Sequence, residues 1–240
     1  MRRRWLLLLL VPIFLLGGAI FLVSQEGTLQ WLAQKIVQAS GGSVEIEGVS
    51  GTLVGSLEIE KVVYTSPERD IEINDLKLAW NPWPLLHGRL EVDQVTAARL
   101  KVELKQSSDE PFTLPQSLAP PFDVQISEVS VDSLSVTKLG AGVTLENVRF
   151  AVTADNAAWH LNNLGFDSPF GNAEINADLG TAKPFKTDGT VRFHNEPAKA
   201  DVDLTVQGDL DRLVVMGRLD GYGARGRLDA IVTPLADFPV

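Results

Sequence analysis

Residues 44–64 read VEIEGVSGTLVGSLEIEKVVY and contain one pattern of apolar residues twice. With Φ for an apolar residue or glycine, the pattern is Φ-x-Φ-x-x-Φ-x-Φ, and four more copies follow before residue 151. The six copies are Val44, Ile46, Val49, Gly51; Leu57, Ile59, Val62, Tyr64; Ile71, Ile73, Leu76, Leu78; Leu90, Val92, Val95, Ala97; Val124, Ile126, Val129, Val131; and Val143, Leu145, Val148, Phe150. Each copy alternates as a β-strand does, because successive side chains on a strand point to opposite faces.

Every copy loses its alternation once, at a central pair of residues such as Glu47-Gly48 or Asn74-Asp75. A slip of one residue turns half of the apolar set to the opposite face of a sheet. A β-bulge, in which two residues oppose one on the partner strand, would correct the slip and bend the strand. The alternative is that each copy forms two short strands joined by a polar turn. Both interpretations predict a sheet with one apolar face.

The composition limits the classes of function. The chain has 240 residues, of which 45% are hydrophobic, enough for one large β domain or two ordinary ones. Its net charge of −10 argues against nucleic-acid binding, which needs basic patches. The acidic residues fall mostly at the polar positions of the alternation, which predicts a solvated outer face. The chain has no cysteine, so disulfides, thiolate zinc sites and cysteine nucleophiles are excluded.

The N-terminus predicts a membrane anchor. Three arginines precede Trp5–Val23, a stretch without charge that is long enough to cross a bilayer as a helix. Arginines before the span keep the N-terminus cytoplasmic and place the remaining chain on the other side of the membrane. The alternative is a signal peptide cleaved near Gly17 or Ala19, which would leave an apolar new terminus. We favour the uncleaved anchor.

A short helix and a loop interrupt the strand pattern. Thr28–Ala39 has a helical period that places Leu29, Leu32, Ile36 and Val37 on one face, and the glycines at 41 and 42 can end the helix. This amphipathic helix either lies on the membrane or across the mouth of the β domain, or packs on the sheet as a cap. Trp80–Arg89 contains two prolines, so it is expected to form a loop or short helical turn.

The second half of the chain is also predicted to be β. Turns are expected over Asp155–Phe170, where the alternation weakens. Short strands joined by tight turns are then expected, which predicts antiparallel pairing. Their ranges are Ala173–Leu179, Gly189–Phe193, Ala200–Val206, Leu213–Leu219 and Ala224–Val232. No terminating domain follows, so we expect a fragment or an early end.

These patterns divide the chain into segments. Gln106–Phe122 contains four prolines and no periodicity, which makes it the best candidate for a boundary. We predict a cytoplasmic stub and transmembrane anchor in 1–24, the amphipathic helix in 25–42, a first β segment in 43–105, a proline-rich linker in 106–122, and a second β segment in 123–240 that is incomplete at its C-terminus.

Residues suited to catalysis are scarce. His87, His160 and His194 lie in unrelated contexts, and none belongs to a zinc-protease or nucleophile-elbow motif. No glycine-rich phosphate loop follows a strand. We therefore expect no enzyme, no catalytic residues, no metal site and no cofactor.

The apolar face of the predicted sheet needs a cover, because exposing it to water forfeits roughly 25 cal/mol per Å². No long amphipathic helix follows residue 40. A second sheet, closure into a barrel or a foreign apolar ligand are the remaining covers. The pattern by itself does not choose between an open gutter that holds lipid and a sandwich.

Several elements in order resemble the N-terminal region of the TamB family, which is related to AsmA-like and bridge-like lipid-transfer proteins. They are the N-terminal span and helix, Val49-Ser50-Gly51-Thr52-Leu53 with Gly55 and Leu57, the tryptophan-proline loop ending in Gly88-Arg89-Leu90, and Pro120-Pro121-Phe122 before Val124-Gln125-Ile126. The resemblance implies a taco-shaped β groove in the periplasm, apolar inside, anchored in the inner membrane. It further implies a barrel-assembly-type partner in the outer membrane. The implied roles are phospholipid transport and insertion of outer-membrane proteins such as autotransporters. Family members are several times longer, and 240 residues are too few to span the envelope.

The resulting prediction is a mainly β protein of the cell inner membrane. A transmembrane helix and a short amphipathic helix precede an elongated, curved, antiparallel β-sheet groove that carries phospholipid acyl chains in outer-membrane biogenesis. The candidates for lining the groove are Val44, Ile46, Leu57, Ile59, Ile71, Ile73, Leu90, Val92, Leu100 and Val102. The alternative is a secreted β-sandwich binding module with a cleaved leader.

Overall fold

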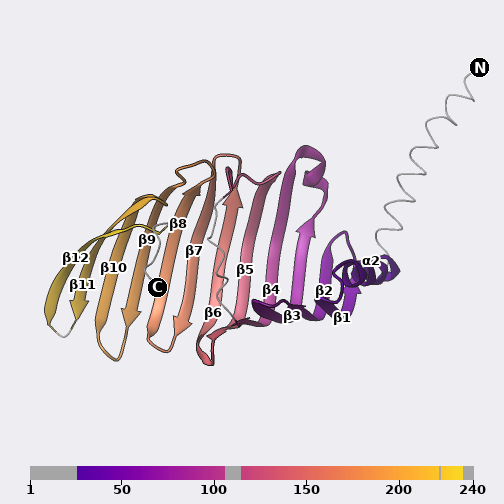
Figure 1. Cartoon of the computed structure of the whole chain (residues 1–240), viewed down its shortest axis with the longest axis horizontal. Coiled ribbons are helices and arrows are strands. Elements are labelled where there is room, and N and C mark those ends of the chain that lie inside the picture. The colour runs from indigo at the N-terminus through magenta and orange to yellow at the C-terminus, as the bar shows by residue number, and fades with distance from the viewer. Residues whose placement is uncertain (1–25, 106–114, 222, 235–240) are drawn as a thin grey trace, which may run out of the picture.

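The computed structural model describes residues 26–105, 115–221 and 223–234, and the elements carry the labels of Figure 1. The helices within these ranges are α2 (Glu26–Ala39) and the 3-10 helix η1 (Trp83–His87). The strands are β1 (Val44–Gly51), β2 (Ser56–Thr65), β3 (Arg69–Asn81), β4 (Arg89–Leu104), β5 (Asp123–Lys138), β6 (Ala141–Ala154), β7 (Ala158–Ser168), β8 (Gly171–Gly180), β9 (Lys186–Asn195), β10 (Ala200–Asp209), β11 (Arg212–Gly221) and β12 (Ala224–Val232). The prediction of a mainly β protein is confirmed.

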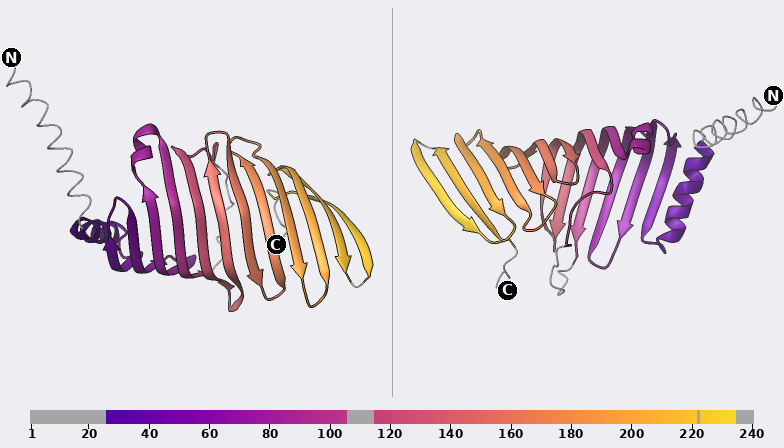
Figure 2. Two further views of the ribbon diagram at one scale, coloured as in Figure 1. Left: turned by 180° about the vertical axis from the view of Figure 1, so that it is seen from behind. Right: turned by 90° about the horizontal axis from the view of Figure 1, so that it is seen from above.

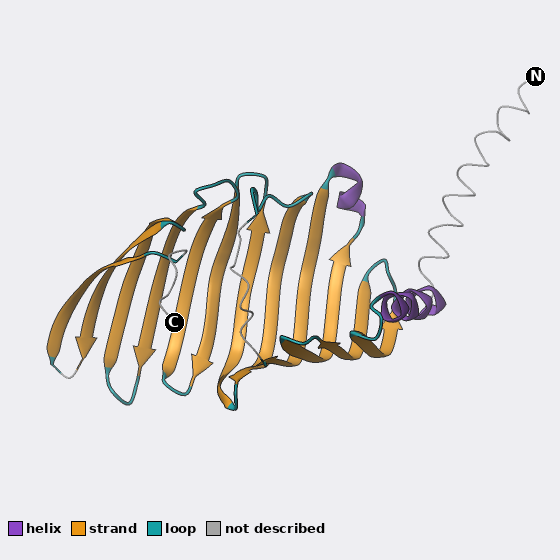
Figure 3. Cartoon of the chain, in the orientation of Figure 1, coloured by secondary structure: helices purple, strands orange, loops and turns teal. Residues whose placement is uncertain are grey.

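All twelve strands belong to one sheet, in which they follow their order in the chain. Figure 3 shows a single layer of strands, and Figure 2 shows that it is open and twisted. Tight turns account for this order: at the β5–β6 turn, Leu139 and Gly140 have φ values of 52° and 83°, as a two-residue hairpin turn requires. The alternative β-sandwich is wrong for the described residues, because their strands form no second sheet.

One pair of strands departs from the predicted antiparallel arrangement. β4 and β5 are parallel, with Arg89 opposite Asp123 and Leu104 opposite Lys138. A parallel pair needs a connection that returns the chain to the end where the first strand began. β5 begins beside the end where β4 began, and Asp123 there donates its backbone N–H to the carbonyl of Gly88 at 3.0 Å. The β segments on the two sides of the proline-rich linker thus meet within one sheet.

The slips in alternation are aligned across the first six strands. Glu47 opposes Lys61, Lys61 opposes Asn74, and no shift in register occurs between β1, β2 and the central part of β3. The aligned pairs are Glu47-Gly48, Glu60-Lys61, Asn74-Asp75, Ala98-Arg99, Asp132-Ser133 and Glu146-Asn147. The predicted bulges are therefore wrong at Glu47-Gly48, Glu60-Lys61 and Asn74-Asp75, where neighbouring strands slip together and keep their apolar residues on one face. At Glu146-Asn147 the register with β5 is kept, but the register with β7 shifts between Glu146 and Arg149, so the predicted bulge is confirmed there. The alternative of two short strands per copy is also wrong, because each strand is continuous.

Left-handed backbone conformations occur within this row of aligned slips. Gly48, Asp75 and Asn147 have φ values of 64°, 54° and 53°. Glycine adopts this region without a steric penalty, and Asp and Asn tolerate it better than other residues. The polar or glycine residues at the slips thus have a local conformational reason.

True bulges occur where a strand slips and its neighbour does not. In β4, Gln94 opposes Ala79 but Val92 opposes Trp80, so β4 contains one extra residue there. In the β5–β6 pair, the two residues of β5 between Ile126 and Val129 lie opposite a single residue of β6. The predicted bulge is confirmed at these positions.

Strand β7 was not predicted, because its asparagines and glycine indicated turns. A further bulge lies between Leu161 and Leu164 in this strand, and Asn163 there has a φ of 52°. The backbone N–H of Asn163 donates to the side chain of Asn176 on β8 at 2.8 Å. The predicted turns are therefore wrong at Asn162, Asn163 and Gly165, which lie inside β7, and confirmed at Asn156 and Pro169, which lie in the connections before and after this strand.

Helix α2 contacts β1 at one end of the sheet. It begins at Glu26, two residues before the predicted start, and ends at the predicted Ala39. Leu29 is buried, whereas Ile36 is 46% exposed, so Ile36 does not belong to the contact face as predicted. Across residues 26–105, 115–221 and 223–234, no helix has the length and apolar character needed to cross a membrane. The predicted anchor in Trp5–Val23 lies outside these residues.

The tryptophan-proline segment forms η1, which confirms the predicted loop or helical turn. Pro82 precedes the helix, and Gly88 ends it with a φ of 75°. Trp80 lies on β3 opposite Val92, whereas Leu86 is 77% exposed.

The protein core is small. Among the described residues, the buried apolar side chains are Leu29, Val92, Ala97, Val131, Val148, Ala154, Ala173 and Phe185. Ala97, Val131 and Val148 form a cluster that lies on one face of β4, β5 and β6. Most other apolar side chains are half-buried, as expected for a sheet with a single layer.

Candidate functional site

The candidate site is the apolar face of the sheet, because residues directly opposite each other on paired strands point to the same side. Four cross-strand rows from β1 to β6 define it. They are Val44-Tyr64-Ile71-Val102-Val136-Val143; Ile46-Val62-Ile73-Leu100-Leu134-Leu145; Val49-Ile59-Leu76-Ala97-Val131-Val148; and Gly51-Leu57-Leu78-Val95-Val129-Phe150. None of these positions carries a charged side chain, so the rows form a continuous apolar surface.

The face continues to the end of the described sheet. Its rows over β8–β12 are Ala173-Phe193-Val202-Leu219-Gly226; Ile175-Val191-Leu204-Gly217-Leu228; Ala177-Gly189-Val206-Val215-Ala230; and Leu179-Thr187-Gly208-Leu213-Val232. Thr187 is the one polar side chain among these positions. With strands about 4.8 Å apart, twelve strands extend this apolar face over about 50 Å.

All ten predicted lining residues lie on the apolar face. Eight belong to the four rows from β1 to β6, and Leu90 and Val92 continue the face where β4 pairs with β5. Val92 opposes Ile126, and Leu90 opposes Val124. Their common placement follows from the register, whereas their contact with lipid remains a prediction.

Other residues on this face were missed by sequence reasoning. Leu134 and Val136 belong to the second half of β5, beyond the copy of the pattern that ends at Val131. A second slip at Asp132-Ser133 places them on the same face as Val131, so the sequence contained a signal for them. Leu164 and Phe166 on β7 pack against the core cluster, but the bulge in β7 hid their alternation.

The described part of the linker lies over one edge of the apolar face. Trp159 is on this face, because it opposes Ala154 and Leu179. Its indole Nε1–H donates to the carbonyl of Leu118 at 2.8 Å. The N–H of Leu118 donates to the carbonyl of Thr181, also at 2.8 Å. The linker is thus fixed at Leu118 to the rim formed by β7 and β8.

A concavity of about 510 Å³ on the opposite, polar face contains Asp203, Arg218, Arg227 and Asp229. Ion pairs also mark this face: Lys61 Nζ lies 4.0 Å from Glu72 Oε1, and Lys77 Nζ lies 3.6 Å from Glu58 Oε1. The side-chain hydrogen bond from Asn74 lowers the pKa of Glu72, and Lys61 adds to this effect. The charge is therefore concentrated on one side of the sheet, as the sequence predicted.

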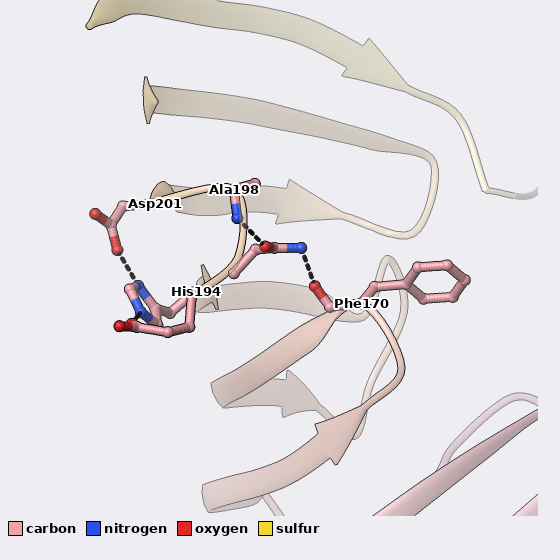
Figure 4. Close-up of polar contacts among 6 residues, drawn as sticks. Phe170, His194, Ala198 and Asp201 are labelled. Atoms are coloured by element: carbon pink, nitrogen blue, oxygen red, sulfur yellow. Dashed lines mark hydrogen bonds and ion pairs between the residues drawn. The ribbon is translucent and has the colours of Figure 1, made fainter. Parts of the chain in front are cut away.

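Two histidines form carboxylate contacts on the polar face. His160 Nδ1 lies 2.6 Å from Asp178 Oδ1. Both ring nitrogens of His194 lie 2.7 Å from carboxylate oxygens, of Asp201 and Glu196 (Figure 4). These contacts with Glu196 and Asp201 raise the pKa of His194.

Next to His194, the side chain of Asn195 accepts from the N–H of Ala198 and donates to the carbonyl of Phe170, so this polar cluster joins two turns. No group of three or more potential ligands suited to a metal ion occurs within the described ranges.

A further concavity of about 480 Å³ lies between α2 and β1. Its walls combine three glutamines of α2 with apolar residues of both elements: Gln30, Ala33, Gln34, Val37, Gln38, Ile46, Gly48 and Val49. Ile46 and Val49 are the first members of two rows of the apolar face. The concavity is therefore continuous with the apolar face at the end of the sheet where α2 lies.

A family model described as the TamB N-terminal domain matches residues 15–156. The chain belongs to the TamB family. The match with TamB covers more than half of the chain, including α2 and β1–β6, and confirms the resemblance drawn from the sequence. Strands β7–β12 extend the same sheet beyond the TamB match. No curated protein matches the chain, and no solved structure does either.

Proposed function

We propose that this TamB-family chain is an inner-membrane-anchored periplasmic protein that carries phospholipid in outer-membrane biogenesis. In this proposal Trp5–Val23 is the anchor, and the acyl chains of the lipid lie on the apolar face. A barrel-assembly-type protein in the outer membrane is the partner of this protein. The observation that supports it is a face without charged side chains that continues over twelve strands and is only half-buried. The role is one of binding and transport, not of catalysis.

The hydrophobic effect provides the driving force for lipid to occupy this face. Each buried methylene contributes about 0.8 kcal/mol, so a long acyl chain gains on the order of 10 kcal/mol before its ordering is subtracted. A continuous face suits transport, because an acyl chain can move along it without leaving apolar surroundings. The charged opposite face keeps the protein soluble in water on that side.

An unfolded outer-membrane protein is the second client implied by the family. Its strands alternate apolar and polar side chains, and their apolar side chains would fit the same surface. The two clients differ in chemistry, so the identity of a covalently trapped ligand separates them.

Photo-crosslinking from neighbouring positions of β5 tests the proposal. Leu134 lies on the apolar face, whereas Ser135 lies on the polar face opposite Lys101. We would replace each in turn with p-benzoylphenylalanine in the full chain, irradiate bacterial cells, and identify the adducts by mass spectrometry. Phospholipid adducts at position 134 and none at 135 are expected. Protein adducts alone at 134 would favour the second client, and equal lipid adducts at both positions would refute transport along the apolar face.

A further inference from the structure

The concavity between α2 and β1 has two kinds of wall. Gln30, Gln34 and Gln38 follow one another at intervals of four residues, so they form one ridge along the helix. Ala33 and Val37 form the neighbouring ridge, and Ile46 and Val49 lie across from them on β1. The space is thus bordered by amides on one side and apolar side chains on the other.

This arrangement matches an amphiphile at the point where its polar and apolar parts join. We propose that the concavity binds the glycerol-phosphate region of a diacyl phospholipid, with its acyl chains continuing onto the apolar face. The inference depends on the proposed lipid function and adds to it a loading site and its ligand chemistry. The volume of about 480 Å³ is within the range of ordinary ligand sites.

Amides suit this part of a lipid. The NH₂ group of a glutamine donates to phosphate and ester oxygens, and its carbonyl accepts from an ammonium headgroup. No charged side chain lines the concavity, although Lys35 Nζ donates to Gln38 Oε1 at 3.5 Å. Recognition by neutral amides predicts that zwitterionic and anionic phospholipids bind about equally well.

The floor of the site leads directly to the proposed transport path. Ile46 opposes Val62 and Val49 opposes Ile59, so each begins a row that crosses to β6. An acyl chain in the concavity would therefore pass onto the face without crossing a charged side chain. Leu29 on α2 is only 4% exposed, and the burial of this side chain holds the helical wall of the site in place.

Crosslinking in the full chain tests where the lipid binds. We would place p-benzoylphenylalanine at Gln34 in the site, at Trp31 on the same helix, and at Leu134 on the distant face. Trp31 is 58% exposed and does not line the concavity. Lipid adducts at 34 and 134 but not at 31 are expected. Equal adducts at 31 and 34 would overturn the inference, because they would mean that α2 simply lies on the membrane.

The outcome at Leu134 separates this inference from the function on which it depends. Adducts at 134 without adducts at 34 would refute the loading site and leave the transport function standing. Silence at both positions would refute the transport function itself.

A triple variant tests the amides. Gln30→Ala with Gln34→Ala and Gln38→Ala is expected to reduce lipid adducts at 134 about tenfold, because neutral hydrogen bonds are lost. Alanine favours helices at least as well as glutamine, so α2 should remain folded. The control is Gln94→Ala with Gln125→Ala and Gln207→Ala, three exposed positions on strands, where no change is expected. An undiminished signal in the first variant would refute the role of the amides.

Lipid composition provides the last arm. The full chain in vesicles of phosphatidylethanolamine or phosphatidylglycerol should give adducts at 34 that agree within about threefold. A strong preference for phosphatidylglycerol that disappears in Lys35→Ala would overturn recognition by neutral amides.

Discussion

A negative charge on the apolar face should block lipid locally. Leu100 lies on β4 between Ile73 and Leu134 of the neighbouring strands, and it packs against the core cluster. An acyl chain that crosses this row contacts it with on the order of four methylenes, which corresponds to about 3 kcal/mol of transfer free energy. Leu100→Glu is therefore expected to reduce lipid occupancy at this row on the order of 100-fold.

The protein should tolerate this change. Leu100 is half-buried, so its substitution removes roughly half of the 1.5–3 kcal/mol that a fully buried leucine contributes, about 1 kcal/mol. This loss is small beside the free energy of unfolding of an ordinary domain, which is roughly 5–15 kcal/mol. A thermal unfolding curve close to that of the parent protein would show that the variant is folded.

The assay measures lipid adducts of p-benzoylphenylalanine at position 134 in the full chain. Ser135→Glu is the matched control, because it introduces the same charge on the polar face opposite Lys101. We expect Leu100→Glu to reduce the lipid adducts at position 134 and Ser135→Glu to leave them unchanged. An equal loss in both variants, or no loss in a folded Leu100→Glu protein, would refute occupation of the apolar face.

Three further predictions concern stability. Gly48→Ala should lower the free energy of unfolding by about 1–2 kcal/mol, because Gly48 has a φ of 64°. The control Gly226→Ala, whose new methyl group would meet Leu219 Cβ at 3.8 Å, should change it by less than about 0.5 kcal/mol. Denaturant titration measures both variants, and equal effects would contradict the conformational argument. Phe185→Ala should cost about 3–5 kcal/mol in the same titration, because this side chain is 1% exposed, whereas Phe170→Ala, at 67% exposed, should cost less than about 0.5 kcal/mol. Glu196 and Asp201 raise the pKa of His194, so the contribution of this ion-pair cluster to stability is complete below the ordinary histidine pKa and disappears as the pH rises through the raised value. NMR titration of the ring should show the raised pKa, and His194→Gln should remove this pH dependence of stability. A ring pKa at or below the ordinary value would disprove the prediction.

Much of the fold was predictable because its signal is local. The six apolar patterns correspond to β1–β6, and Ala224–Val232 agrees with β12 at both ends. Prediction failed at β7, where Asn163 in a bulge resembles a turn residue, since turns and bulges use the same left-handed conformation. It also failed for the β4–β5 pair, because the direction of pairing depends on the path of the linker and not on either strand.

The candidate site was predictable in part for the same reason. Val44, Ile73 and Val102 could be assigned to a face from alternation, but Leu134 required knowledge that two slips in β5 each restore the face. The α2–β1 concavity could not be predicted, because its walls come from the helical period of α2 and the strand period of β1, and their relative placement is a tertiary property.

The amino-acid sequence determined which residues form strands and that each strand has an apolar and a charged side, because period-two alternation is set by the geometry of a single strand. Tertiary structure decided that the slips at Gly48 and Asp75 align across neighbours without a change of register, and that the strands of the described residues form one layer with no second sheet among them. Both depend on contacts between segments far apart in the chain, and no single segment specifies its partner.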